Sequence, residues 1–197
     1  MYTLIGSART RAFRVLWLLE ELGVRYEHLP AGPRSPDVTE HYPAGKVPVL
    51  LADGTALTDS TAIMSFLADR HQGMTFPAGT IQRAIQDGHT QFLLDEFDAC
   101  LWTAARHTFV LPEADRVPEV KESLKKEFEH SQKRFVQRLG DGPFLMGETM
   151  TIADIVAVHC ADWAVAARFP ITEPAFRHYV ERLHERPAFK ASRAKTA

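Results

Sequence analysis

The sequence predicts two domains, an α/β domain followed by an all-α bundle. Over residues 1–75, short strand-like runs alternate with segments of helical periodicity, whereas residues 80–197 hold only long segments of helical spacing. A stretch containing Gly and Pro, residues 73–79, separates the two patterns and marks the expected boundary. Helices without strands can cover their apolar stripes only with one another, so the second domain is expected to be a bundle.

The first elements predict a β-α-β unit. Residues 2–5 and 24–29 have the pattern of strands, and the helical spacing of residues 12–22 ends at Gly23, a residue typical of helix C-termini. Such a unit implies a parallel pair of strands with a right-handed crossover. The proline-rich segment 30–44 then allows at most a short, irregular helix.

A β-hairpin is predicted after this segment. Pro48 cannot donate to a sheet ladder, so we expect the strand to begin there and to leave the backbone of Val47 free on one side. Residues 52–55 form a tight turn that leads to a short return strand over 56–58. A helix over 61–71 is expected to follow.

The turn and the following helix start together predict a binding site for a small acidic peptide. If the Val47–Pro48 bond is cis, the turn presents the N–H and C=O of Val47 as a strand partner would. Asp59 and Ser60 stand at the expected helix start, where free N–H groups and the helix dipole attract a carboxylate. Taken singly, the two motifs are also compatible with an ordinary strand start and an ordinary helix N-cap.

These motifs, in this order, resemble the glutathione-binding half of the glutathione S-transferase superfamily, which has a thioredoxin-like fold. The resemblance implies that Val47 and Pro48 pair with the cysteinyl backbone of glutathione. It further implies that Asp59 and Ser60 hold the γ-glutamyl end. Lys46 is expected to contact the glycyl carboxylate, with simple solvent exposure as the alternative.

The second domain carries a matching signal. Thr151 and Asp154 have the spacing of a capping box, and Met150 and Ile155 that of a hydrophobic staple. The superfamily has the same device at the start of its central C-terminal helix, so the resemblance spans both domains and gives Asp154 an architectural role. Helices are expected over residues 81–109, 117–139, 151–168 and 174–186, with a short one from 187.

The resemblance also implies a hydroxyl or thiol between the first strand and the first helix. A hydrogen bond donated to the substrate sulfur lowers the thiol pKa. The loop of residues 6–11 has no cysteine, which disfavours the thiol-transfer and dehydroascorbate-reductase branches, because these use a cysteine there. The loop has no tyrosine either, so the remaining hydroxyl donors are Ser7 and Thr10. Counting from the helix favours Thr10 and counting from the strand favours Ser7, while either can instead cap the loop.

Two further groups of side chains are candidates. Arg11 and Arg14 lie at the start of the first helix, where the dipole disfavours cations, so we expect them to be solvated or to meet an acidic ligand. Trp102, Arg106 and Phe109 recur at helical spacing and are expected to line the apolar pocket for the second substrate. An aromatic stripe of this kind more often belongs to a helix core than to a pocket.

Composition excludes several classes of function. The formal net charge of −2 argues against a nucleic-acid partner. No apolar run is long enough to span a membrane, and the short start before Gly6 lacks the features of a secretion signal, so a cytoplasmic location is expected. Cys100 and Cys160 have the positions of core thiols, and the histidines lack the spacing of metal ligands, so no metal is expected.

The predicted function is that of a glutathione transferase. It would activate the glutathione thiol and join it to a small hydrophobic electrophile, as in detoxification. The resemblance implies a homodimer in which the first domain of one subunit packs against the helical domain of the other. The alternatives are a non-catalytic glutathione-binding or scaffold protein of the same fold, and a glutathione-dependent peroxidase or isomerase.

Overall fold

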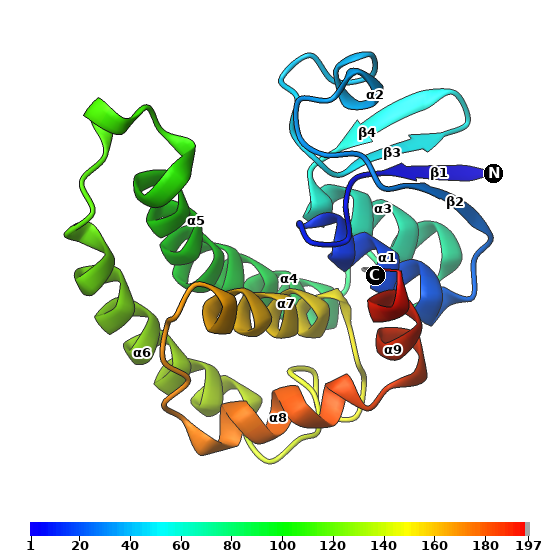
Figure 1. Cartoon of the computed structure of the whole chain (residues 1–197). Coiled ribbons are helices and arrows are strands. Elements are labelled where there is room, and N and C mark those ends of the chain that lie inside the picture. Colours follow the sequence, from blue (N-terminus) through cyan, green and yellow to red (C-terminus); the bar gives the residue numbers. More distant parts are fainter. Residues whose placement is uncertain (196–197) are drawn as a thin grey trace. The chain divides into compact units, whose positions relative to one another are not determined.

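The computed structural model describes residues 1–195, which form two compact units. The first unit holds Met1–Thr80 together with the described residues from His184 onward, and the second holds Ile81–Leu183. Every named strand among the described residues belongs to the first unit (Figure 1). The predicted combination of an α/β domain and an all-α domain is therefore confirmed.

The first unit is built on a four-stranded mixed sheet. Its strands are β1 (Tyr2–Ile5), β2 (Tyr26–Leu29), β3 (Val49–Ala52) and β4 (Thr55–Thr58), in the order β2-β1-β3-β4. β1 pairs with β2 in parallel and with β3 in an antiparallel manner, and β3 pairs with β4 in an antiparallel manner. This is the thioredoxin-like arrangement that the β-α-β unit and the hairpin predicted.

Helices cover both faces of this sheet. The helices of the first unit are α1 (Ala12–Leu22), α2 (Pro36–Thr39), α3 (Ser60–His71) and α9 (Pro187–Ala194), of which α9 packs on α1. α1 and α3 cover one face, whereas Val38 of α2 packs on the other face against Ile5 and Val49 (Figure 1). α1 is buried at every residue from Ala12 to Leu19, because it also contacts α3 and α9.

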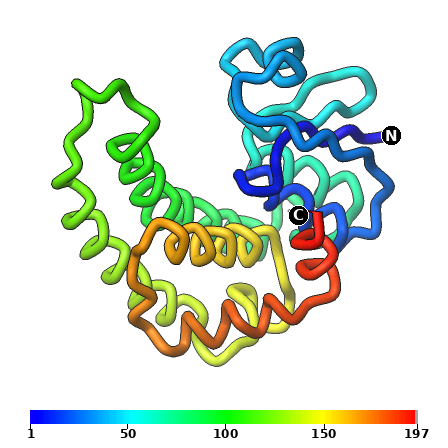
Figure 2. Tube along the Cα trace, viewed as in Figure 1, coloured from blue at the N-terminus to red at the C-terminus, as the bar shows by residue number. Residues whose placement is uncertain are grey.

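The last helix packs on the first unit. In Figure 2 the red C-terminal segment lies beside the blue α1, which it contacts closely. The Trp17 and Phe189 rings are 4.9 Å apart between centroids, and the Arg186 guanidinium donates two hydrogen bonds to Glu21, of 2.6 and 2.7 Å. The sequence pattern, by contrast, predicts that residues 184–197 belong to the helical domain.

The second unit is helical. Its elements are α4 (Ile81–Leu93), η1 (Leu94–Asp98), α5 (Ala99–Ala105), η2 (Arg106–Val110), η3 (Glu113–Asp115), α6 (Val120–Leu139), α7 (Ile152–Ala166) and α8 (Pro174–His184). The stretch from α4 to η2 corresponds to the long helix expected over residues 81–109. It contains two π-helical segments, η1 and η2, which a pattern of apolar spacings does not distinguish from an α-helix.

Aromatic side chains fill the core of the second unit. Phe97 is fully buried and meets the rings of Phe92, Phe128 and Phe176 edge-on, at centroid distances of 5.7, 5.0 and 5.7 Å. Such edge-to-face contacts stabilise the core beyond the burial of apolar area. Within residues 1–195, no helix is both long and apolar enough to cross a membrane.

The predicted capping box at the start of α7 is present. The buried Asp154 carboxylate accepts hydrogen bonds from the N–H groups of Thr151 and Leu145, at 2.7 and 2.9 Å, and from the Tyr179 hydroxyl at 2.7 Å. These contacts join the helix start, the preceding loop and α8. Asp154 therefore has the architectural role that the sequence predicted.

Candidate functional site

The loop between β1 and α1 lies directly beside the turn before β3. The Val47–Pro48 bond is cis, as predicted. Gly6 has a φ of +146°, and a Cβ atom placed there would lie 2.9 Å from the Ala12 Cβ and 3.2 Å from the Val47 Cβ. Only glycine allows this backbone conformation and this close approach. Gly6 thus brings the loop with the candidate hydroxyls next to the turn.

The turn presents an open backbone edge. The ladder of β3 begins at Val49, and no described residue forms a backbone hydrogen bond with the N–H or C=O of Val47. Such an edge can pair with an extended peptide. Lys46, the residue before it, is exposed, and its amino group has no partner among residues 1–195.

The structure distinguishes the two candidate hydroxyls. The Thr10 hydroxyl donates a 2.7 Å hydrogen bond to the Ser7 carbonyl oxygen and accepts one of 3.2 Å from the Ala12 N–H. The Ser7 hydroxyl accepts a 3.3 Å hydrogen bond from the Arg9 N–H, and no described residue accepts its proton. A hydroxyl has one proton to donate. The proton of Thr10 is therefore used within the loop, whereas that of Ser7 is available to a ligand.

Asp59 caps α3. Its φ is +69°, and its Oδ1 atom accepts hydrogen bonds from the N–H groups of Thr61 and Ala62, at 2.8 and 3.1 Å. α3 consequently begins at Ser60, one residue earlier than expected. No hydrogen bond within the described chain reaches the Oδ2 atom, so the cap leaves one carboxylate oxygen for a ligand.

Arg14 corrects the expectation of a solvated side chain. It is 0% exposed, and its Nη1 lies 3.5 Å from the Oγ of Ser60, which is also buried. The reason is that α1 is covered on all sides along its first two turns, so this side chain cannot reach solvent. The unbroken apolar run around Arg14 was the signal in the sequence. The buried guanidinium adds positive charge beside the N-terminus of α3.

The residues expected to bind the second substrate belong to the second unit. Trp102 lies on α5 and is half-buried. Arg106 and Phe109 lie on η2, where both are exposed. All three belong to the stretch from α5 to η2, and their role in binding an electrophile stays a prediction.

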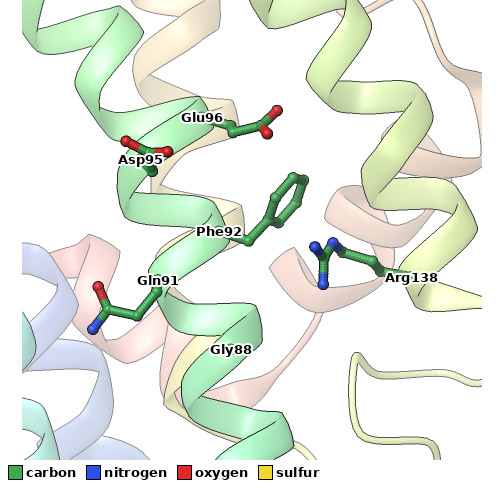
Figure 3. Close-up of a pocket in the computed structure, with 6 residues that line it drawn as sticks. All are labelled: Gly88, Gln91, Phe92, Asp95, Glu96 and Arg138. Carbon is green, nitrogen blue, oxygen red and sulfur yellow. The ribbon is translucent and has the colours of Figure 1, made fainter.

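A surface hollow of about 470 Å³ lies between α4, η1 and α6 (Figure 3). The residues that line it are Gly88, Gln91, Phe92, Asp95, Glu96 and Arg138. Figure 3 shows the Arg138 side chain pointing toward the Phe92 ring, and its Cζ is 4.3 Å from the ring centroid. None of the residues predicted to bind glutathione or the electrophile lines this hollow.

The two thiols of the chain are poor nucleophiles. Burial and the neighbouring Glu127 carboxylate, 3.8 Å from the sulfur, raise the pKa of Cys100 to about 12. Cys160 is 0% exposed. A thiol reacts as its thiolate, so a nucleophilic sulfur at this site must come from a bound molecule. Across the described residues, no group of three or more His, Cys, Asp or Glu side chains is placed to hold a metal ion.

Comparison with known proteins identifies relatives of both units. Residues 10–70 match the family model of the glutathione S-transferase N-terminal domain, and residues 97–187 match that of the C-terminal domain. Glutathione S-transferase 2 of Anopheles gambiae is 32% identical over 162 residues, which cover 78% of this chain and 74% of that protein. Hematopoietic prostaglandin D synthase of Gallus gallus is 28% identical over 202 residues, or 97% of this chain and 95% of that protein.

A solved structure shows the same fold. The glutathione transferase URE2P8 of Phanerochaete chrysosporium, crystallised with oxidized glutathione, has a TM-score of 0.85 to this chain at 21% identity. The match covers 99% of this chain and 94% of that one. Both units therefore have counterparts in that protein.

Proposed function

Because this chain belongs to the glutathione S-transferase family, we propose that it joins the thiol of glutathione to a small hydrophobic electrophile. The observation that supports this most directly is the free proton of the Ser7 hydroxyl, on a loop that touches the open backbone edge at Val47. A hydroxyl that can donate a hydrogen bond to a thiol and a backbone edge that can pair with a peptide thus lie within one unit. Glutathione, a peptide with a thiol, needs both.

The binding roles follow from the geometry of the first unit. We assign the backbone of Val47 to the cysteinyl residue of glutathione, next to the cis bond before Pro48. Ser60 and the N-terminus of α3 would hold the γ-glutamyl carboxylate, with the charge of Arg14 behind them. The free Oδ2 of Asp59 would accept from the ammonium group, and Lys46 would pair with the glycyl carboxylate.

In this proposal Ser7 activates the thiol. Its hydroxyl donates a hydrogen bond to the sulfur and stabilises the thiolate, which lowers the thiol pKa, and the thiol proton passes to water. The thiolate then attacks the electrophilic carbon. A carbon–sulfur bond forms and the bond to the leaving group breaks, with its electron pair departing on, for example, chloride. The enzyme contributes activation and proximity and forms no covalent bond itself.

The test is turnover with two electrophiles. We expect the protein and glutathione to convert a chlorodinitrobenzene into its glutathionyl conjugate, with one chloride released per conjugate, and to do so faster than glutathione alone. An organic hydroperoxide serves as the second electrophile. Turnover of the hydroperoxide alone would identify a peroxidase. Retention on immobilised glutathione without turnover of either compound would instead identify a binding protein.

We also propose that the protein is a homodimer that acts in the cytoplasm in detoxification. Twofold pairing is the commonest way in which subunits assemble. Sedimentation at micromolar concentration should give about twice the chain mass of 22.1 kDa. A mass near that of one chain would contradict the homodimer and leave the proposed chemistry in place.

A further inference from the structure

The peptide unit between Gly6 and Ser7 is held at both of its polar ends. The N–H group of Ser7 donates a 2.8 Å hydrogen bond to the carbonyl oxygen of Ala31. At the other end of the same peptide unit, the carbonyl oxygen of Gly6 lies 2.8 Å from the Nε2 atom of His28. A peptide unit is planar, so two contacts on opposite sides fix its orientation. That orientation sets the point from which the Ser7 side chain extends.

The contact between His28 and Gly6 has a defined direction. A carbonyl oxygen can only accept a hydrogen bond, so the Nε2 atom of His28 carries a proton and is the donor. No backbone N–H group of residues 1–195 donates to the same oxygen. The N–H groups of Gly6 and Ser7 pair with the carbonyl oxygens of Leu29 and Ala31, and these backbone contacts do not depend on the identity of a side chain. Of the three contacts, the one from His28 is therefore the one that a side chain specifies.

The backbone at Gly6 needs such a contact. Gly6 has a φ of +146°, a conformation that glycine adopts far more readily than other residues. The missing Cβ atom allows the close approach to Val47, but it also leaves glycine more rotational freedom than any other residue. A hydrogen bond to the Gly6 carbonyl oxygen removes part of that freedom. His28 thus holds the joint between β1 and Ser7.

The strand β2 gives His28 a fixed place within the first unit. His28 is half-buried and lies opposite Leu4 in the parallel ladder of β1 and β2. Tyr26 lies two residues earlier on the same face of the strand, and its hydroxyl donates a 2.6 Å hydrogen bond to Glu20 of α1. Side chains on a paired strand are held more precisely than side chains on a loop. The strand can therefore impose a defined position on the loop that carries Ser7.

On the basis of the proposed transferase function, we infer that His28 is a positioning residue, which holds Ser7 where its hydroxyl can donate to the sulfur of glutathione. A donor that is out of place stabilises a thiolate less, even when the hydroxyl itself is still present. His28 acts through Ser7 and needs no contact with glutathione. Its effect on the thiol should consequently disappear when the Ser7 hydroxyl is absent.

The test compares variants that keep or remove the donor at residue 28. His28→Leu removes it at similar size, and His28→Asn removes it by shortening the side chain, which gives a second variant if His28→Leu does not fold. His28→Gln keeps an N–H group at about the reach of Nε2. Tyr26→Phe is the matched control, because it removes a hydrogen bond from the same face of β2 without touching the loop. The double variant of Ser7→Ala and His28→Leu tests whether the two residues act together.

The measurements are the thiol pKa of bound glutathione, from the ultraviolet absorbance of the thiolate against pH, together with kcat and glutathione affinity. His28→Leu and His28→Asn should raise this thiol pKa by about 0.5 to 1 unit and lower kcat at neutral pH about three- to tenfold, with little loss of affinity. His28→Gln should restore most of the parent values, and Tyr26→Phe should keep them. In the Ser7→Ala background, His28→Leu should add no further shift.

Three outcomes would overturn the inference while leaving the proposed function in place. The first is a parent thiol pKa in both His28→Leu and His28→Asn. The second is a thiol pKa in His28→Gln as high as in His28→Leu, which would mean that the donor is not what His28 contributes. The third is a full further shift in the Ser7→Ala background, which would mean that His28 does not act through Ser7. If the parent protein itself neither lowers the thiol pKa of glutathione nor turns over an electrophile, the proposed function fails and the inference fails with it.

Discussion

The Thr10 hydroxyl donates a 2.7 Å hydrogen bond to the carbonyl oxygen of Ser7, and this bond assigns different roles to the two hydroxyls of the loop. Thr10 uses its only proton to shape the loop and accepts the N–H of Ala12 at the start of α1. Ser7 keeps a free proton on a loop that touches Val47. A group that stabilises a thiolate needs a free donor, so Ser7 is the residue to which our proposal gives this role.

The first prediction concerns these two hydroxyls. Ser7→Ala should raise the pKa of the bound glutathione thiol by about one to two units, because a hydrogen bond to a charged group contributes roughly 1.5–3 kcal/mol. At neutral pH less thiolate would form, so kcat should fall much more than glutathione affinity. The measurement is the ultraviolet absorbance of the thiolate against pH, together with the rate.

Thr10→Ala is the matched control for Ser7→Ala. It removes the loop contact and should lower the free energy of unfolding by about 1 kcal/mol with a smaller shift of the thiol pKa. If Ser7→Ala, Thr10→Ala and the double variant all keep the parent thiol pKa and the parent rate, neither hydroxyl activates the thiol.

The second prediction separates the two roles of Asp59. Asp59→Asn keeps an oxygen that can cap α3 but removes the charge, whereas Asp59→Ala removes both. Both variants should weaken glutathione binding by about 1.5–3 kcal/mol, the worth of a charge-assisted hydrogen bond. Only Asp59→Ala should also lower the free energy of unfolding, by about 1 kcal/mol. Calorimetric titration and urea unfolding measure the two effects. Unchanged affinity in Asp59→Asn would remove this carboxylate from the site.

Features that depend on neighbouring residues in the sequence could be predicted. The cis bond before Pro48, the hairpin after it and the capping box of Thr151 and Asp154 are all correct. A proline permits the cis bond, and short spacings set the hairpin and the capping box. The parallel pairing of β1 and β2 followed in the same way from the helix between them.

Features that depend on residues far apart in the sequence could not be predicted. Arg14 is buried because α3 and α9 cover α1, and these helices lie far from it in the sequence. α9 packs on the first unit through Phe189 and Arg186, contacts that a helical pattern alone does not reveal. Our proposed preference for Ser7 over Thr10 likewise rests on the direction of one hydrogen bond.

The third prediction concerns Cys100. Its pKa of about 12 means that almost no thiolate forms at pH values where a free thiol is largely ionised. Alkylation of the folded protein by iodoacetamide should therefore stay slow as the pH rises to about 9, near the ordinary pKa of a thiol. Protein unfolded in urea provides the reference rate. Removal of the neighbouring carboxylate in Glu127→Gln should lower the pKa and speed alkylation. Fast alkylation of the folded parent would show an accessible thiolate and contradict the prediction.

The last prediction concerns Asp154, whose carboxylate satisfies three buried donors at once. Asp154→Ala leaves the N–H groups of Leu145 and Thr151 and the Tyr179 hydroxyl without an acceptor, and should destabilise the protein by about 3–5 kcal/mol. Tyr179→Phe removes one donor and leaves no unpaired group, so it should lower the free energy of unfolding by only about 1 kcal/mol. Urea unfolding measures both variants, and Tyr179→Phe remains measurable if Asp154→Ala does not fold. Because the role of Asp154 is architectural, folded Tyr179→Phe should keep the glutathione affinity of the parent. Equal stability of the parent and Asp154→Ala would mean that the hydrogen bonds at the start of α7 do not hold the helical unit together.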